Sequence, residues 1–392
     1  MEQNYNTVQN LKTYEKALRE NYLPVWRNGL TTEPSPLLGK IKKKKLTSDK
    51  IVANAKIGLS GGFGFGAEGL STPRAGAVKI EKFETNSKDM YVNIALSTKA
   101  VRLTGSGGAM ANALDTEVKG AYETAKWNVG RSIFGNGKGI LALATGANSG
   151  DVIPVTSTKF LKEGLIVDIL TPAGVIVGTD RIKAVDRKEN KVQLYNALET
   201  ANEYIITVQQ SYNKEITGLG AIFDADVKTL YGVSKDENRV IVPEVVDANT
   251  DIDDSVIWDA VEGAETYKNS KIDMIMMGKN AYKHYIEYLR TNNVRVESMT
   301  KEITGGFKAI EYAFGNRSID VVYEQFIPDD EAWCVETDAL ELHIQEWDFA
   351  DLQGGGIFNL MENTSVYRAL LANYGDLICT NPGGLVRITN CA

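Results

Sequence analysis

Residues 108–134 read GAMANALDTEVKGAYETAKWNVGRSIF, and the stop Gly135-Asn136-Gly137 follows directly. Apolar residues recur there at intervals of three or four, which places them on one helix face; they are Leu114, Val118, Ala121, Ala125, Val129 and Ile133. The pattern predicts one amphipathic helix that ends at the glycines. At about 1.5 Å per residue such a helix spans roughly 40 Å, which makes it the longest element we expect.

The segment before this helix, residues 54–105, combines a glycine-rich stretch with alternating strands. Six glycines lie between residues 58 and 69. Residues 78–80 and 90–96 then alternate apolar and polar side chains, which predicts two strands joined by the polar turn 84–89. A lone two-stranded hairpin is marginally stable in water, so we expect this one to lie against another surface.

The chain after the helix consists of two segments with different predicted secondary structure. Residues 150–212 predict a small antiparallel barrel or sandwich, with strands at 152–155, 165–170, 175–178, 182–185, 192–195 and 204–209. From residue 218 onward helices and strands mix, which is typical of an α+β fold. We expect a helix that is capped by Asp254 or Ser255 and runs to about 268, a helix over 279–292, and strands at 271–278, 319–323 and 332–336.

The first fifty residues predict an arm that ends in a lysine run. A first helix is expected at about 9–20, and Pro24, Pro34 and Pro36 are expected to break regular structure after it. Residues 38–50 carry six lysines against one aspartate, a charge of +5, whereas residues 51–392 carry −13 of the total of −8. The run itself consists of Lys42, Lys43, Lys44 and Lys45.

This lysine run has three interpretations. It is a solvated arm, a contact with an acidic neighbouring subunit, or a contact with nucleic-acid phosphates, and salt would screen both contacts. We favour the subunit contact because the rest of the same chain carries −13. The net charge of −8 also disfavours a freestanding DNA-binding protein, whose affinity comes from clustered Lys and Arg.

Few residues suit catalysis or metal binding. The three cysteines are widely spaced, which disfavours a disulfide framework or a zinc site, and His284 and His343 lie far apart in the sequence. No G-x-S-x-G, H-E-x-x-H or Walker pattern is present. No signal peptide and no apolar run of membrane length is evident either. The sequence therefore predicts a soluble cytosolic protein that is not an enzyme and has no cofactor and no metal.

Two short matches to known motifs have simpler interpretations. Residues 64–69 fit the dinucleotide-binding glycine pattern, but Pro73 and Gly76 follow where that motif needs a helix, so we expect a flexible loop. Residues 247–253 resemble the start of a calcium-binding loop but lack its later glycine and glutamate. We expect these aspartates to favour the start of the next helix, with a weak cation site as the alternative.

The order of these pieces resembles the major capsid protein of tailed bacteriophages, whose fold is shared with encapsulins. The resemblance covers most of the chain. It is sharpest at the Gly-Gly-Phe-Gly-Phe-Gly stretch 61–66, the 108–134 helix with its Phe134-Gly-Asn-Gly stop, and the segment 366–377. It implies an α+β capsid fold with an N-terminal arm, an extended β-hairpin loop, a long spine helix, peripheral and axial domains, and a β-rich insertion.

The resemblance also implies a division of the chain. Residues 1–53 would be an arm that reaches a neighbouring subunit, and residues 54–105 an extended loop that lies over an adjacent subunit. Residues 106–149 would hold the spine helix and the start of the peripheral domain. The remaining segments would be the insertion at 150–212, the axial domain at 213–335, and a C-terminal return to both sheets at 336–392.

The implied function is structural: the chain would assemble into the icosahedral capsid around phage double-stranded DNA. An encapsulin-like nanocompartment is the alternative, and a β-rich enzyme with an α+β catalytic domain is a more distant one. Subunit contacts are expected at Lys42 to Lys45 and at Gly62, Gly64 and Gly66, since flexible glycines suit contacts that vary between subunits.

Expected partners follow from the same resemblance. They are further copies in hexamers and pentamers, a portal, packaged DNA bound without sequence specificity, and no membrane. A separate scaffolding protein is also expected, because relatives with a fused scaffold carry a long N-terminal extension. The chain would assemble in the host bacterial cytoplasm and reside in the virion. Some relatives join subunits through Lys–Asn crosslinks, for which Lys79, Lys82, Lys88 and Asn381 are the candidates here.

Overall fold

The computed structural model divides the chain into two compact units. One consists of Met1–Gly130 and Ala221–Ala392, and the other of Arg131–Gly220. The structure describes residues 15–16, 18–56, 58, 61–66, 74–97, 107–249, 251–292, 300–303, 306–350, 356–361 and 364–391. Within these residues, no helix is long and apolar enough to cross a membrane.

The N-terminal segment of the first unit is helical and packs on its own chain. A π-helical turn at Leu18–Tyr22 leads into α2 (Leu23–Thr32), and α3 (Pro36–Lys40) follows. The described part of the helix expected at about 9–20, residues 15–16 and 18–20, is helical, and helical structure continues to Thr32. Residues 9–14 and 17 lie outside the described residues. Pro24 does not break α2, because it lies in the first turn, where its missing N–H has no helical partner to lose.

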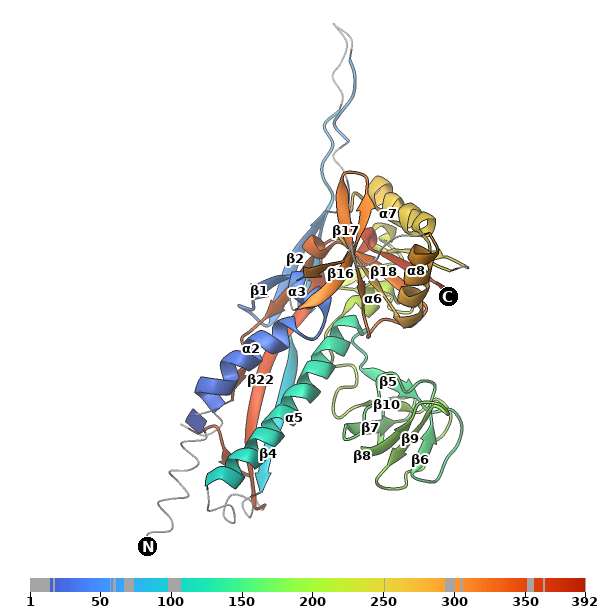
Figure 1. The fold of residues 1–392 in the computed structure, drawn as a ribbon. Coiled ribbons are helices and arrows are strands. Elements are labelled where there is room, and N and C mark those ends of the chain that lie inside the picture. The colour runs from blue at the N-terminus through green and yellow to red at the C-terminus, as the bar shows by residue number, and fades with distance from the viewer. Residues whose placement is uncertain are drawn as a thin grey trace. The chain divides into compact units, whose positions relative to one another are not determined.

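Residues 18–40 therefore contribute to the core of the first unit. Their buried side chains are Leu18, Leu23, Trp26, Leu30, Leu37 and Leu38. Helix α2 lies along the long helix α5 (Figure 1), and the rings of Trp26 and Tyr122 are 5.4 Å apart. Burial against the same chain therefore holds this part of the expected arm 1–53 in place.

A six-stranded sheet forms the elongated part of the first unit. Strand β22 (Val366–Cys379) pairs antiparallel with β4 (Lys88–Ser97) through ten residue pairs, from Val366↔Ser97 to Gly375↔Lys88. On its other side β22 pairs with three strands, of which β19 also pairs with β1 in parallel. The bounds are β19 Leu340–Ile344, β20 Asp348–Phe349, β21 Asn359–Leu360 and β1 Lys42–Lys45.

The predicted hairpin between residues 78–80 and 90–96 is wrong in its pairing. Strand β3 (Ile80–Asn86) pairs antiparallel with β2 (Lys50–Lys56), and these two strands form a sheet of their own. Only Ser87 separates β3 from β4, yet β4 joins β22. The expectation that the segment lies against another surface holds for β4, whose partner comes from the C-terminal part of the chain.

The helix expected over 108–134 is present as α5 (Gly107–Phe134), and it ends at the predicted glycines. Its predicted apolar face is buried at Val118, Ala125, Val129 and Ile133. Beyond the helix, Gly137 has φ +82°, a left-handed conformation that glycine adopts without steric cost.

A seven-stranded mixed sheet and two helices make the second core of the first unit. The strand order is β13-β23-β18-β14-β17-β16-β15. The bounds are β13 Glu244–Asp247, β23 Val386–Thr389, β18 Ala332–Val335, β14 Met274–Met277, β17 Arg317–Tyr323, β16 Phe307–Phe314 and β15 Thr300–Ile303. The C-terminal residues thus enter both large sheets, as β22 and β23.

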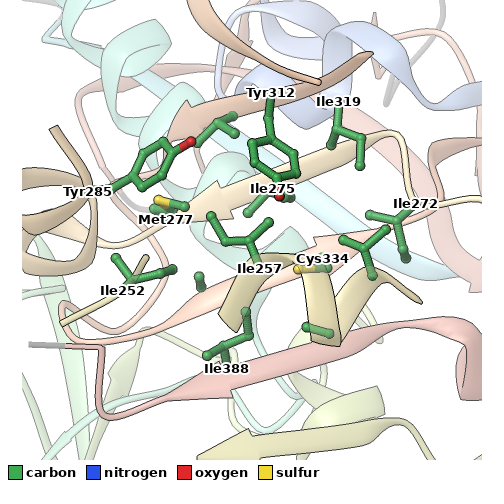
Figure 2. Close-up of a cluster of buried hydrophobic side chains, with 14 of the residues drawn as sticks. Ile252, Ile257, Ile272, Ile275, Met277, Tyr285, Tyr312, Ile319, Cys334 and Ile388 are labelled. Atoms are coloured by element: carbon green, nitrogen blue, oxygen red, sulfur yellow. The ribbon is translucent and has the colours of Figure 1, made fainter. Parts of the chain in front are cut away.

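Helices α7 (Asp254–Lys268) and α8 (Lys279–Thr291) pack on this sheet and bury an apolar cluster (Figure 2). In it Ile257 from α7 and Tyr285 from α8 meet Met277 from the sheet. Asp253 caps α7, since its Oδ1 accepts the Val256 N–H at 2.9 Å. The cap therefore lies one residue before the expected Asp254 or Ser255.

Short elements connect these layers. They are α6 (Leu219–Phe223), the two-stranded hairpin of β11 (Thr229–Leu230) and β12 (Val233–Ser234), and 3₁₀ turns at Arg239–Ile241, Thr337–Ala339 and Pro382–Gly384.

The second unit is a six-stranded antiparallel barrel with its own apolar core. The strand order is β5-β10-β7-β8-β9-β6, and a bridge between Ala144 and Val155 joins the ends of β5 and β6, which closes the barrel. The bounds are β5 Ile140–Leu143, β6 Val152–Pro154, β7 Ile166–Leu170, β8 Ile176–Asp186, β9 Lys191–Leu194 and β10 Ile205–Val208.

The sequence therefore predicts the barrel but gives it sequence bounds that are too narrow. The compact unit covers residues 131–220, not 150–212, because β5 contributes to the same core. The two strands predicted at 175–178 and 182–185 are one continuous strand, β8.

Candidate subunit-contact surface

The two-stranded ribbon of β2 and β3 is anchored at its root by buried contacts. Phe83 is fully buried, with its ring 5.6 Å from that of Tyr231. The Glu84 N–H donates to the Tyr231 carbonyl at 2.9 Å, and Thr85 Oγ1 donates to Asp376 Oδ2 at 2.5 Å. Because Asp376 belongs to β22, the root of the ribbon is fixed to the six-stranded sheet.

Beyond this root the ribbon extends away from the rest of its unit (Figure 1). Residues 61–66 and 74–79 are exposed throughout. The two segments lie side by side, since a Cβ on Gly76 would be 2.5 Å from the Gly61 nitrogen and one on Gly62 would be 3.3 Å from the Gly76 nitrogen. Glycine at these positions lets the two backbones approach closely.

Two aromatic side chains in this stretch lack cover from the described part of their own chain. Phe63 is 83% exposed and Phe65 is 95% exposed, and their rings contact edge to face with centroids 5.4 Å apart. Burying a phenylalanine side chain is worth about 1.5–3 kcal/mol. An uncovered pair at the end of a projecting ribbon is therefore a strong candidate for a contact with another molecule.

The three glycines singled out from the sequence lie in this same stretch. Gly62, Gly64 and Gly66 are all exposed, and Gly66 has no other atoms within 4 Å of where a Cβ would lie. The dinucleotide-binding interpretation fails, because residues 61–66 and 74–79 are not helical. Residues 67–69 of that motif lie outside the described residues.

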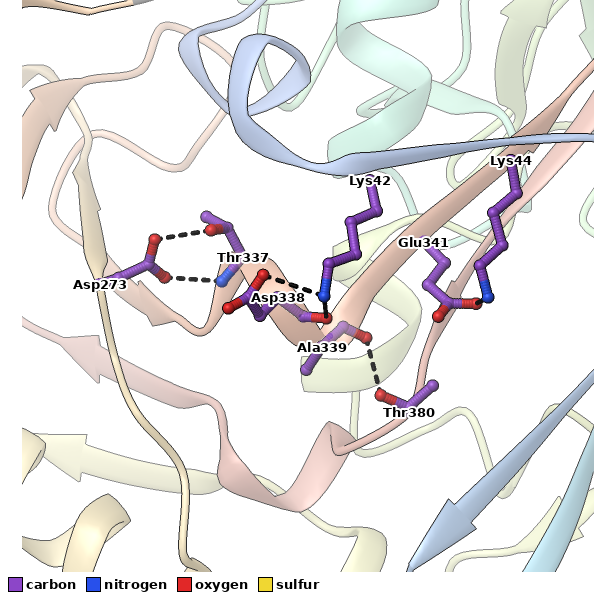
Figure 3. A network of polar contacts seen from close by, with 8 residues as sticks. All are labelled: Lys42, Lys44, Asp273, Thr337, Asp338, Ala339, Glu341 and Thr380. Atoms are coloured by element: carbon purple, nitrogen blue, oxygen red, sulfur yellow. Dashed lines mark hydrogen bonds and ion pairs between the residues drawn. The ribbon is translucent and has the colours of Figure 1, made fainter.

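The lysine run forms strand β1, at the edge of the six-stranded sheet. Lys42 Nζ lies 3.0 Å from Asp338 Oδ1, and Lys44 Nζ lies 2.7 Å from Glu341 Oε2 (Figure 3). Asp338 lies in a 3₁₀ turn whose Thr337 N–H donates to Asp273 Oδ1 at 2.7 Å. Alternate lysines of the run thus neutralise acids of their own chain.

The other two lysines, Lys43 and Lys45, have no carboxylate partner in the described part of the chain. Successive side chains of a strand point to opposite faces, which explains why Lys43 and Lys45 differ from their neighbours. The surrounding protein partly desolvates Lys43 and lowers its pKa. A carboxylate from another molecule would oppose that shift by stabilising the charged form.

The lysines of the ribbon are paired along it. Lys79 Nζ lies 3.1 Å from Glu81 Oε1 and donates to Asn238 Oδ1 at 3.0 Å. Lys50 and Lys82 both form ion pairs with Glu84 and lower its pKa. Asn381, the other candidate for crosslinking, lies at the root of the ribbon beside Ala55 and Phe83.

The aspartates of residues 247–253 all interact with groups of their own chain. Asp253 caps α7, Asp251 Oδ1 lies 3.1 Å from His284 Nδ1, and Asp247 Oδ1 accepts from Asn390 Nδ2 at 2.9 Å. Over the described residues, no three His, Cys, Asp or Glu side chains gather as metal ligands. The weak cation site therefore has no support in this geometry.

The three cysteines are free and buried. Burial raises the pKa of the Cys334, Cys379 and Cys391 thiols to about 12 in each case. All three are therefore protonated at neutral pH, and none has the thiolate character of a nucleophile.

Comparison with known proteins identifies the fold. No family model matches the sequence, and no curated protein is similar to it at the sequence level. The capsid asymmetric unit of cyanophage A-1(L) superimposes with a TM-score of 0.52 at 11% identity, over 91% of this chain and 92% of that one. This chain has the tailed-phage major capsid protein fold.

Two further solved structures are similar over most of their length at lower TM-scores. The encapsulin complex of Synechococcus elongatus PCC 7942 matches with a TM-score of 0.45 at 9% identity, over 89% of this chain and 85% of that one. The satellite phage P4 procapsid with its size determination protein matches with a TM-score of 0.46 at 11% identity, over 94% and 90%.

Phe63 and Phe65 are the residues of this surface that the sequence interpretation missed. The sequence pattern of the 61–66 stretch predicts contacts at its glycines, whereas the two aromatic residues lie between those glycines. The signal was available, because large apolar side chains between glycines have no neighbouring side chain to cover them locally. The structure adds that no other described segment covers them.

Proposed function

We propose that this chain is the structural subunit of a capsid shell that encloses double-stranded DNA and is built from hexamers and pentamers of the chain. The observation that carries this proposal is the projecting ribbon with Phe63 and Phe65 exposed at 83% and 95%. A segment that is anchored at its root and uncovered at its end gains stability only when another molecule covers it. A second copy of the chain is the cover that the capsid fold supplies.

The lysines of β1 support the same role. Lys43 and Lys45 are exposed cations without acidic partners in the described part of the chain, while the chain as a whole has a net charge of −8. We assign them to a contact with an acidic surface of a neighbouring subunit. Such contacts are individually weak, but a closed shell repeats them many times and so gains strength from their number.

The proposed setting follows from this role. The shell would assemble in the cytoplasm of a host bacterium and form the capsid of the virion. A portal and a separate scaffolding protein are the proposed partners in assembly, and the packaged DNA would be enclosed without sequence-specific contacts. The role is structural and involves no enzymatic reaction.

Electron microscopy of the purified, overexpressed chain tests the proposal. We expect hollow polyhedral shells, tubes or ring-shaped capsomers. The variant Phe63→Ser/Phe65→Ser should remain a folded, unassembled subunit, as judged by circular dichroism and sedimentation. A wild-type chain that stays a compact monomer at every salt and protein concentration would overturn the proposal.

A further inference from the structure

At the start of β8, a segment of the barrel unit has one side that no other strand of the barrel pairs with. Strand β8 pairs with β7 from Ile176 to Arg181 but with β9 only from Ile182 to Asp186. Residues 131–220 are all described, and no other strand among them pairs with the free side of Ile176–Thr179. We call residues 176–179 the β8 edge. Val175 precedes this edge, and its backbone N–H and C=O bond to Thr171. An unpaired edge presents backbone N–H and C=O groups that a further strand can bind.

The β8 edge begins with two exposed apolar side chains, Ile176 and Val177, and Val175 before it is exposed as well. Val175 is 63% exposed, Ile176 is 56% exposed and Val177 is 40% exposed. The register shifts at this point, since Ile169 pairs with Gly178 but Leu170 with Ile176, which makes Val177 the extra residue of a β-bulge. Three consecutive exposed apolar residues are unusual at a strand edge, where charges or prolines normally prevent association.

The barrel does not need these side chains for its own core. A Cβ on Gly178 would lie 2.6 Å from Leu198 Cδ2, so the space beside Gly178 is already filled by Leu198. Gly174, near the edge, is likewise backed by the ring of Tyr212, 2.8 Å from where its Cβ would lie. The exposed apolar side chains are therefore available to a partner.

The charge around the β8 edge indicates which partner fits. Residues 171–179 contain no charged side chain, although the chain carries 43 basic and 51 acidic residues. A phosphate or an acidic peptide would find no cation among these residues. The carboxylates of Asp168 and Asp180, which lie beside Thr179, are already bonded within the barrel, since Asp168 accepts from Thr179 Oγ1 and Asp180 accepts from the Asn196 N–H. An equally uncharged apolar strand matches, and the same edge of a second copy is one. Two acidic chains also approach with least repulsion where both lack charge.

We propose that the β8 edge of one copy pairs antiparallel with the β8 edge of a second copy across a two-fold axis. In such an isologous contact each copy offers the same N–H and C=O groups and the same apolar side chains to the other. The inference rests on the proposed function, because a pairing of about four residues is weak by itself and becomes effective among the many copies of a shell.

Site-directed crosslinking tests the pairing in the full chain. Near a two-fold axis residue 177 of one copy lies close to residue 177 of the other, so Val177→Cys should give a covalent dimer with a short bis-maleimide. The native cysteines are buried and leave the background low. Ile166→Cys is the matched control, an exposed apolar residue of β7, a strand of the same barrel that is paired on both sides, and it should give no dimer.

A second variant and parallel microscopy separate the two proposals. Adding Ile176→Lys to Val177→Cys should abolish the dimer, because it places two like charges in the contact. Shells formed by the Val177→Cys chain that give no covalent dimer would overturn the inference and leave the proposed function standing. A covalent dimer that forms in solution without any shells would support the inference and overturn the proposed function. A chain that forms no dimer and no shells would overturn the inference and the proposed function together. Binding of the chain to phosphatidylcholine vesicles that Ile176→Lys abolishes would also overturn the inference, since it would make lipid the occupant.

Discussion

Arg131 and Glu215 form a buried bidentate ion pair within the barrel unit. Arg131 Nη1 donates to Glu215 Oε2 at 2.9 Å and Nη2 donates to Oε1 at 2.5 Å. The two side chains are only 6% and 9% exposed. Arg131 lies in the last turn of α5 and Glu215 follows β10, so the pair connects the two places where the chain enters and leaves this unit.

Removing the cation of this pair should destabilise the barrel. Arg131→Met leaves the Glu215 carboxylate buried without a partner, which costs about 3 kcal/mol or more. Hydrogen exchange of the barrel strands measures the loss locally, which matters because a two-unit chain need not unfold in one step. The double variant Arg131→Met/Glu215→Leu should recover most of the stability. A double variant as unstable as the single one would show that the pair is not the cause.

The cysteine thiols should make stability fall at alkaline pH. Their pKa is raised from an ordinary value of 9.0 to about 12 by burial, so the folded state keeps them protonated while the unfolded state ionises. The contribution is complete below pH 9 and is lost as the pH rises toward 12. Urea unfolding at a series of pH values measures this. Replacement of Cys334 and Cys379 by alanine should flatten the decline, and an unchanged pH profile would contradict the assignment.

The same burial predicts thiol reactivity. At pH 8 the native chain should react with a thiol-specific reagent at none of its cysteines, whereas the chain in denaturant should react at all three. Rapid reaction of a native thiol would mean that its segment opens readily, since both burial and the raised pKa oppose attack.

The parts of the fold that the sequence predicts are those specified by local pattern. Helix α5 carries its apolar period and its glycine stop within about thirty residues, so no distant partner is needed to recognise it. The barrel is similarly local, because all six strands lie between residues 140 and 208. The sequence does not predict its first strand, β5, because the apolar run 140–144 has no alternation to distinguish a strand from other buried segments.

The parts that the sequence does not predict depend on distant pairing. Strand β4 alternates like a hairpin partner of β3, yet its partner β22 begins at Val366. The lysine run is predicted to contact a neighbouring subunit, and nothing local in the sequence indicates that it pairs with β19 at Leu340–Ile344 of its own chain. Composition alone therefore singled out Lys42 to Lys45 as a surface, while only the structure separates the two lysines with internal partners from the two without.

Replacing the two exposed phenylalanines should block assembly and spare the fold. Phe63→Ser/Phe65→Ser removes side chains that are 83% and 95% exposed, so the unfolding free energy of the subunit should change by less than about 0.5 kcal/mol. Loss of two aromatic anchors from an interface costs several kcal/mol of binding, which should reduce shell yield strongly. Light scattering and sedimentation measure the yield. Val152→Ser, an exposed apolar change in the barrel, is the control, and equal yields from all three chains would remove the ribbon end from the interface.

Alternate lysines of β1 should have different effects on assembly. Lys43→Ala/Lys45→Ala removes the two cations that lack partners in the described part of the chain, so shell formation should weaken most at low salt, where charge contacts are least screened. Lys42→Ala/Lys44→Ala removes exposed pairs with Asp338 and Glu341, each worth about 0–1 kcal/mol to the subunit, and should leave assembly nearly unchanged. Light scattering across a salt series distinguishes the two. If both double variants assemble alike at low salt, Lys43 and Lys45 do not contact a neighbouring subunit. The lysines of β1 would then have a role only within the six-stranded sheet of their own chain.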